Sequence, residues 1–112
     1  MVIEIAGHPD YAITDSGEVI SYKRHDYPRT LLPDYSNGYP RVNLDGERRY
    51  LADLVAEYFL PLPKHPSCKV FYIDGDKTNC CASNLIWLMP SEIQMYSQYT
   101  VEYRKQVLGE WA

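Results

Sequence analysis

Two carboxylates on either side of a glycine form the segment of this sequence that is best suited to binding a cation. Asp74 and Asp76 flank Gly75 in the polar run 74–79, an arrangement that resembles the start of a calcium-binding loop. Such a loop ends in a bidentate Glu at its twelfth position, which is Leu85 here. The segment therefore favours a solvated turn over a calcium site.

The cysteines and histidines do not predict a second metal site. Cys80 and Cys81 are adjacent and lack the two-residue gap of a zinc-binding pair. The other candidate ligands are scattered along the chain: Cys68, His8, His25 and His65. We therefore predict reduced, partly buried thiols and no metal bound by these residues.

Basic side chains interleaved with tyrosines are the candidates for contacting phosphate. Lys23 and Arg24 follow a predicted hairpin, and Arg41, Arg48 and Arg49 lie on later strands of the same predicted sheet. On such a surface the cations would contact phosphates while tyrosine rings stack on bases. Acidic residues lie among them and would cancel much of the positive charge: Glu18, Asp26, Asp34, Asp45 and Glu47. A mixed, solvated face is an equally good interpretation.

The tyrosines favour a different function, the binding of a protein. The chain has 11 of them, and tyrosine combines a large buried area with a polar tip. Tyr96, Tyr99 and Tyr103 span two faces of a predicted C-terminal helix, so at least one should point outward. We take Tyr39 and Tyr99, with the basic residues, as candidates for binding nucleic acid or another partner. Ordinary packing against the sheet explains the tyrosines equally well.

Length and charge restrict the class of protein. A chain of 112 residues has the size of one compact domain. Its 11 Lys and Arg against 15 Asp and Glu give a formal net charge of −4, so nucleic acid would have to be bound by a local patch. We find no apolar run of about 18 residues and no basic, apolar start typical of a secretory signal. We therefore expect a cytoplasmic protein.

Turn-forming residues divide the first half of the chain into short strands. One hairpin is predicted over residues 11–22 with its turn at 15–17. Another is predicted over residues 41–51, where the Asp-Gly pair at 45–46 is the strongest hairpin signal. Residues 1–51 are thus predicted to form a small antiparallel sheet.

The pattern of the second half predicts helices around one further hairpin. Apolar residues at helical spacing indicate a short buried helix over 52–59. Strands at 69–73 and 84–88 are predicted to pair antiparallel across the polar loop. A single amphipathic helix is expected after Pro90, capped by Ser91 and continuing to about Leu108.

This order of elements, with particular residues inside it, resembles the small HNH endonucleases of phages and mobile elements that carry a β-rich module before the nuclease motif. Residues 5–21 resemble the opening hairpin of that module, and residues 37–44 resemble its next strand. Residues 54–59 resemble the first nuclease helix, and residues 73–79 with 84–87 resemble the ββα-metal core. The resemblance implies an α+β fold with an N-terminal antiparallel β module, a degenerate ββα-metal (HNH-like) core and a C-terminal helix.

The resemblance also implies where catalytic residues should lie, and those positions carry unsuitable side chains. The family's general base, a His, immediately precedes its Ile-Asp-Gly segment, with a metal ligand one residue earlier; these positions are Tyr72 and Phe71. Tyrosine, with a pKa of about 10, is a poor base, and phenylalanine has no lone pair for a metal. The second ligand position is Ile93, which cannot coordinate a cation. We therefore predict no catalytic and no metal-binding residues.

Two further positions differ from the family and two are retained. The His before the first nuclease helix is Ala52, and the Asn that ties the core loop is Cys80. Asp74 and Asn84 keep the family's identity, and both suit a structural role, because an Asp accepts loop N–H groups and an Asn bridges loop to strand. Their retention indicates the fold rather than an activity.

We predict one compact domain with a β module at 1–51, an HNH-like core at 52–93 and a C-terminal helix at 94–112. The leading hypothesis is a catalytically inactive HNH-endonuclease-like protein of a phage or mobile element, without a cofactor, in the cytoplasm of a bacterial host. It would bind a macromolecular partner, such as a host nuclease or defence factor that it inhibits.

Two alternatives remain open. One is a protein that binds double-stranded DNA without cutting it. The other is an active Mg²⁺-dependent DNA endonuclease with rearranged carboxylate ligands, drawn from Asp53, Asp74, Asp76 and Glu92.

Overall fold

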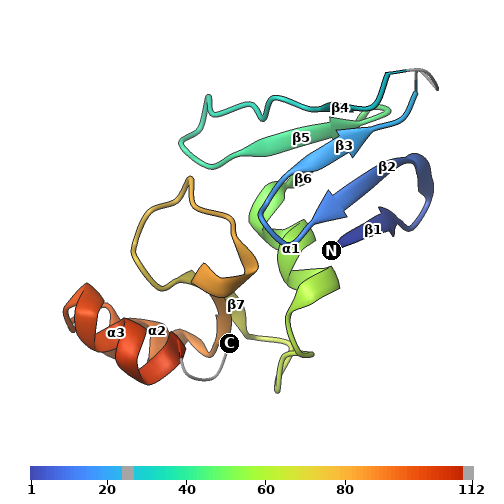
Figure 1. Cartoon of the computed structure of the whole chain (residues 1–112). Helices are drawn as coiled ribbons and strands as arrows, with labels where there is room; N and C mark the ends of the chain where they lie inside the picture. The colour runs from blue at the N-terminus through green and yellow to red at the C-terminus, as the bar shows by residue number, and fades with distance from the viewer. Residues whose placement is uncertain (24–26, 110–112) are drawn as a thin grey trace.

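The protein is elongated, with its N-terminal strands at one end and its last two helices at the other (Figure 1). In a computed structural model the described residues are 1–23 and 27–109, and the molecule extends 46 × 27 × 22 Å. Antiparallel strands and separate helices make it an α+β protein, which confirms the predicted fold class. Within the described ranges, no helix is long and apolar enough to cross a membrane.

The N-terminal sheet contains four antiparallel strands in chain order: β1 (Val2–Ile5), β2 (His8–Thr14), β3 (Val19–Ser21) and β4 (Arg29–Thr30). The predicted hairpin is confirmed, since β2 and β3 pair across the turn at 15–17. β1 was not predicted from the sequence. It pairs with β2, with Ile3 opposite Ile13, and a register shift between Glu4 and Ile5 interrupts its regular alternation.

A second, separate sheet consists of β5 (Arg41–Leu44) and β6 (Glu47–Tyr50), so the prediction of one sheet over 1–51 is wrong. The hairpin itself is confirmed: Asp45 and Gly46 both have positive φ, 56° and 94°, as a two-residue turn of this kind requires. Between β4 and β5 the chain contains Pro33 and Pro40, which lack an N–H group for a ladder. Only an isolated bridge joins β5 to the preceding loop.

The helix α1 (Leu51–Phe59) confirms the predicted buried helix and lies between the sheets and the rest of the chain. Leu54 and Val55 are fully buried, and the helix ends at Leu60, before Pro61. Its apolar face joins one hydrophobic core with members from both sheets and from the segment after α1: Ile5, Ile13, Val19, Val42, Leu44, Cys80 and Leu85. This core crosses the boundary that the sequence suggested between residues 51 and 52.

The predicted antiparallel pair is confirmed as β7 (Lys69–Tyr72) and β8 (Leu85–Leu88), with Tyr72 opposite Leu85. A short 3₁₀ helix (Ala82–Asn84) leads into β8. The turn of the first hairpin, at 15–17, packs on the loop between β7 and β8. There the Ala82 N–H donates to the carbonyl of Asp15 over 2.8 Å. The N-terminal module is therefore attached directly to the loop that connects β7 with β8.

The prediction of a single helix after Pro90 is wrong, because this segment forms two helices, α2 (Pro90–Tyr96) and α3 (Val101–Leu108). The Ser97 hydroxyl donates to the Ile93 carbonyl over 2.6 Å, and Thr100 caps α3 by accepting from the Tyr103 N–H over 3.2 Å. The predicted cap is also wrong, since Met89 is the N-cap residue of α2. Both helices cover a second hydrophobic cluster, which contains Phe71, Ile73, Leu88 and Leu108.

Candidate functional site

A cleft of about 670 Å³ lies where the N-terminal module, β7 and the last two helices meet. It contains all three positions at which the family resemblance implied catalytic residues: Phe71 and Tyr72 from β7, and Ile93 from α2. The other lining residues lie between Tyr39 and Arg104: Tyr39, Tyr50, Ala52, Asp53, Cys68, Lys69, Val70, Gly75, Lys77, Trp87, Ser97 and Arg104. The fold thus assembles a site at the expected place, with different side chains.

The side chains at the expected catalytic positions are chemically inert. Phe71 is 7% exposed and belongs to the second hydrophobic cluster, against which Ile93 also packs. Desolvation, with repulsion from Cys80 and Asp53, raises the pKa of the Tyr72 phenol well above its usual range. Tyr72 therefore stays protonated at neutral pH and cannot serve as a general base.

Both oxygens of the retained Asp74 carboxylate accept hydrogen bonds from residues of the segment between β7 and β8. Its Oδ1 accepts from the Asp76 N–H over 2.8 Å and from the Asn84 side chain over 2.9 Å, and its Oδ2 accepts from the Asn79 side chain over 2.8 Å. Partial burial acts to raise its pKa, but these hydrogen bonds outweigh that effect and lower it. The structural role expected for Asp74 and Asn84 is thus confirmed.

Two of the other carboxylates considered as substitute ligands also accept hydrogen bonds from residues close by in the sequence. Asp76 accepts from the N–H and hydroxyl of Thr78, and Glu92 accepts from the Met89 N–H over 2.9 Å at the start of α2. In the part of the chain that the structure describes, no three His, Cys, Asp or Glu side chains come together as ligands. The residues of this cleft do not fit the divalent cation of a ββα-metal site.

The cysteines are free thiols, as predicted. Cys80 is buried, and Cys68 and Cys81 are half-buried. Burial, with repulsion from Cys81 and Asp76, raises the pKa of the Cys80 thiol to about 11. Cys80 is therefore a packing residue rather than a reactive thiolate.

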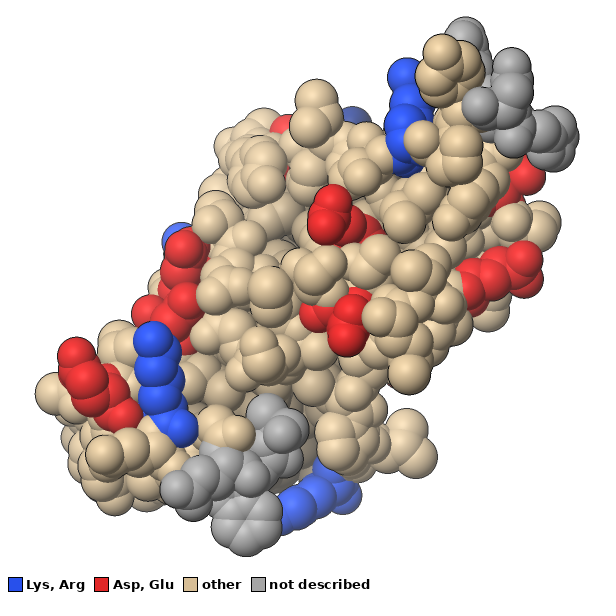
Figure 2. All heavy atoms as spheres, in the orientation of Figure 1, with Lys and Arg blue, Asp and Glu red and all other residues tan. Residues whose placement is uncertain are grey.

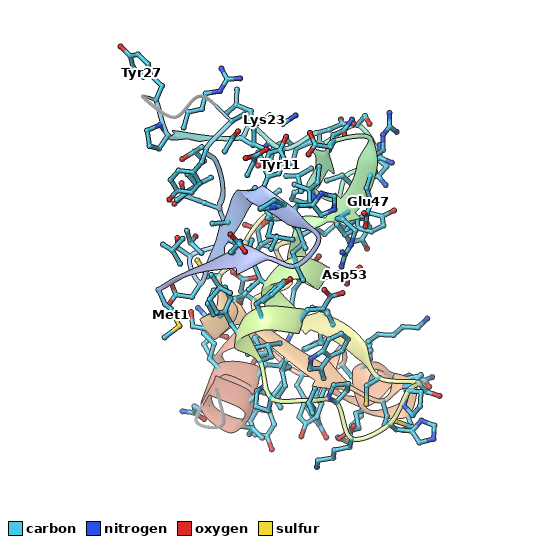
Figure 3. All side chains as sticks on the ribbon, turned by 90° about the vertical axis from the view of Figure 1, so that its right-hand side faces the viewer. Met1, Tyr11, Lys23, Tyr27, Glu47 and Asp53 are labelled. Carbon is cyan, nitrogen blue, oxygen red and sulfur yellow. The ribbon has the colours of Figure 1, made fainter. Side chains whose placement is uncertain are left out.

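Most of the basic candidates from the sequence are neutralised by acidic neighbours. Lys23 pairs with Asp45 and lies beside the Tyr11 ring, 5.8 Å from its centroid (Figure 3). Arg41 lies 3.3 Å from Asp34, and Arg49 lies 2.6 Å from Glu57 and 3.6 Å from Glu47. Arg48 is exposed on β6, and Arg24 lies outside the described residues. On the face shown in Figure 2, acidic side chains lie among the basic ones and no continuous basic area forms.

The two candidate tyrosines lie at different places. Tyr39 lines the cleft, with its ring centroid 6.3 Å from those of both Tyr50 and Tyr72. Tyr99 lies in the turn between α2 and α3, where its ring contacts those of Tyr96 and Tyr103 at centroid distances of 6.1 and 4.9 Å. Of the partner-binding candidates that the structure describes, only Tyr39 belongs to the cleft.

The cations that do line the cleft were not selected from the sequence. They are Lys69, Lys77 and Arg104, and none forms an ion pair with another described residue. Asp53, at the start of α1, is the carboxylate among the lining residues (Figure 3). Arg104 lies in the middle of α3. Its position four residues before the buried Leu108 was the signal that it faces inward.

Comparison with known proteins agrees with this description of the fold. Residues 3–45, from β1 to β5, match the NUMOD4 motif. The solved structure described as "DNA binding and cleavage by the HNH homing endonuclease I-HmuI" is similar with a TM-score of 0.69 and 25% sequence identity. The similarity covers 96% of this chain and 65% of that chain, so this protein spans about two thirds of the endonuclease's length. No curated protein matches the chain. The NUMOD4 motif is found in HNH homing endonucleases and the fold is similar to that of one of them, so both comparisons support the resemblance of this chain to HNH endonucleases.

Proposed function

We propose that this protein binds double-stranded DNA in the cleft without cleaving it. The observation that carries the proposal is the content of the cleft: inert side chains at the catalytic positions, together with three cations that have no acidic partner among the described residues. The solved endonuclease with the same fold is described as binding and cleaving DNA. This chain would retain the first property and lose the second.

Loss of cleavage follows from the chemistry that hydrolysis of a phosphodiester requires. A general base must take a proton from water, and a metal ion must stabilise the departing oxygen. Tyr72 holds its proton, and Phe71 and Ile93 offer no metal ligand. The remaining cleft groups can bind a phosphate but cannot activate water.

Binding of a polyanion follows from the charge of the cleft. Among the described residues, the cleft is lined by three cations, Lys69, Lys77 and Arg104, and by one carboxylate, Asp53, although the whole protein carries a net charge of −4. A local patch of this kind attracts phosphates even in an acidic protein. The rings of Tyr39 and Tyr50 add apolar surface against which a sugar or a base could pack.

Duplex DNA should bind with a moderate dependence on salt and should remain intact. Three phosphate contacts predict a plot of log affinity against log salt with a slope of about −3. Fluorescence anisotropy with a labelled duplex measures the slope, and a plasmid-nicking assay with Mg²⁺ or Mn²⁺ measures cleavage. Lys64→Gln, a charge change in the exposed segment after α1 and outside the cleft, is the matched control and should bind like the wild type.

Two results would reject the proposal. Absence of duplex binding at low salt would remove the DNA-binding function. Nicking that depends on Mg²⁺ and copurifies with the protein would instead show an active endonuclease with rearranged ligands. In that case Asp74→Ala would report whether the retained carboxylate takes part.

Replacing Asp53 by asparagine should strengthen duplex binding. The substitution removes a negative charge that repels phosphates in the cleft, and we expect a gain of roughly two- to fivefold, the size of a partly exposed charge interaction. Partial desolvation and repulsion from Glu57 already raise the pKa of Asp53, so its charge is poorly stabilised. Anisotropy at low salt measures the gain. Asp10→Asn makes the same charge change on β2, outside the cleft, and an equal gain there would contradict a local effect.

A protein partner, such as a host nuclease or defence factor that is inhibited, is the second candidate. The supporting observation is the cluster of Tyr96, Tyr99 and Tyr103, in which Tyr99 and Tyr103 are 42% and 46% exposed. Affinity capture from a bacterial lysate tests it. A partner retained at high salt and released by Tyr99→Ala would support this function, whereas recovery of DNA alone would reject it.

A further inference from the structure

The guanidinium of Arg104 lies where the fold would otherwise place a metal site. It comes from the middle of α3, and its Cζ lies 5.5 Å from the centroid of the Phe71 ring, at the first expected ligand position. A Cβ atom added to Gly75 would lie 4.0 Å from one of its terminal nitrogens. Arg104 therefore reaches both β7 and the start of the loop that follows it.

The positive charge of Arg104 is not compensated by the described residues. It forms no salt bridge with them, and its Nε is buried without a hydrogen-bond acceptor. The nearby carboxylate of Asp74 is already used by Asn79, Asn84 and the Asp76 N–H. A buried donor of a charged group without a partner is costly, so the guanidinium would be stabilised by an anion bound at its terminal nitrogens.

The groups around Arg104 suit a phosphate ester better than a carboxylate or a metal. Lys77 lies over the Tyr39 ring, 4.9 Å from its centroid, and Lys69 lines the same cleft. Several cations spaced around one cleft match the repeated charges of a phosphodiester chain. Arginine adds a planar fork that binds two phosphate oxygens at once.

We propose that Arg104 replaces the divalent cation of the nuclease and binds a DNA phosphate without any metal. This inference rests on the proposed binding of DNA in the cleft and specifies the group that carries it. A guanidinium neutralises a phosphate as a cation does, but it has no bound water whose proton it can weaken. The exchange of a metal site for an arginine therefore keeps binding and abolishes hydrolysis.

The first test compares duplex binding with Mg²⁺ and with EDTA, and in Arg104 variants. Wild-type affinity should be the same in both conditions. Arg104→Gln should lose about tenfold in affinity and reduce the salt slope by about 1, which a purely structural role would not do. Arg104→Lys should recover part of the affinity, because it restores the charge without the fork. Lys64→Gln serves as the control outside the cleft.

The second test does not need a variant to fold. Inorganic phosphate is titrated into the ¹⁵N-labelled wild-type protein in EDTA, and the arginine Nε–H resonances are followed by NMR. We expect the Arg104 signal to shift and the signal of Arg29, which is exposed on β4 outside the cleft, to stay unchanged. A shift without any duplex binding would support the phosphate site and reject the DNA-binding function.

Other outcomes overturn the inference and leave the proposed function standing. One is duplex binding that disappears in EDTA. Another is an Arg104→Gln protein that unfolds like the wild type in urea and binds duplex with unchanged affinity and salt slope. In either case the cleft binds DNA by other groups.

Discussion

Replacing Gly17 by alanine should destabilise the protein by about 2–5 kcal/mol. Gly17 has a φ of 89°, and a Cβ added there would lie 2.8 Å from both the carbonyl carbon and the oxygen of Cys80. The left-handed backbone costs a non-glycine residue about 1–2 kcal/mol, and relieving a contact with backbone costs about 1–3 kcal/mol more. Urea unfolding followed by tryptophan fluorescence measures the change.

Gly46→Ala is the matched control for this prediction. Gly46 has a φ of 94°, close to that of Gly17, but a Cβ there meets nothing within 4 Å. It should therefore cost only the backbone strain, about 1–2 kcal/mol. Equal losses in the two variants would show that the hairpin turn does not pack on the Cys80 loop in solution.

The second large effect is expected for Asn84→Ala, at about 2–4 kcal/mol. Asn84 is 7% exposed, its Oδ1 accepts from the Asp74 N–H over 3.0 Å, and its Nδ2 donates to Asp74 Oδ1 and to the Asn79 carbonyl. Alanine leaves the partly buried Asp74 N–H and Asn79 carbonyl without this partner and removes one of the two hydrogen bonds to Asp74 Oδ1, which is more costly than the loss of exposed hydrogen bonds. Urea unfolding measures the loss, and hydrogen exchange should show faster opening of residues 74–79.

Asn43→Ala is the control, because the exposed Asn43 side chain accepts from the Gly46 N–H. Its loss should cost no more than about 1 kcal/mol. A cost for Asn84→Ala no greater than that of Asn43→Ala would contradict the role of Asn84 in holding the loop.

The effect of Asn84→Ala should also depend on pH. The pKa of Asp74 is lowered in the folded protein, since its hydrogen bonds outweigh the effect of burial. Its carboxylate therefore adds stability above its unfolded pKa of about 4, and this stability is lost as pH falls through the folded pKa. Asn84→Ala removes one of these hydrogen bonds, so it should cost less in acid than at pH 7.

Local chemistry made much of the fold predictable. The turns at 15–17 and 45–46 and the helix that ends before Pro61 follow from residue types within a few positions of each other. The break between α2 and α3 could not be predicted in this way, because serine and threonine also occur inside helices. Only the hydrogen bonds of Ser97 and Thr100 show that the helix is interrupted there. β1 was also missed, and the register shift between Glu4 and Ile5 interrupts the regular alternation by which a strand is identified from its sequence.

The sequence by itself determined which side chains occupy the positions at which the family resemblance implies a base and metal ligands: Phe71, Tyr72 and Ile93, of which Phe71 and Ile93 have no lone pair for a metal. Only the tertiary structure decided which charges remain available. Lys23, Arg41 and Arg49 meet acidic partners on the N-terminal sheets, while Lys69, Lys77 and Arg104, separated by up to 35 residues, converge on one cleft. Whether a cation is neutralised depends on neighbours a few ångströms away, and those neighbours are set by packing rather than by position in the chain.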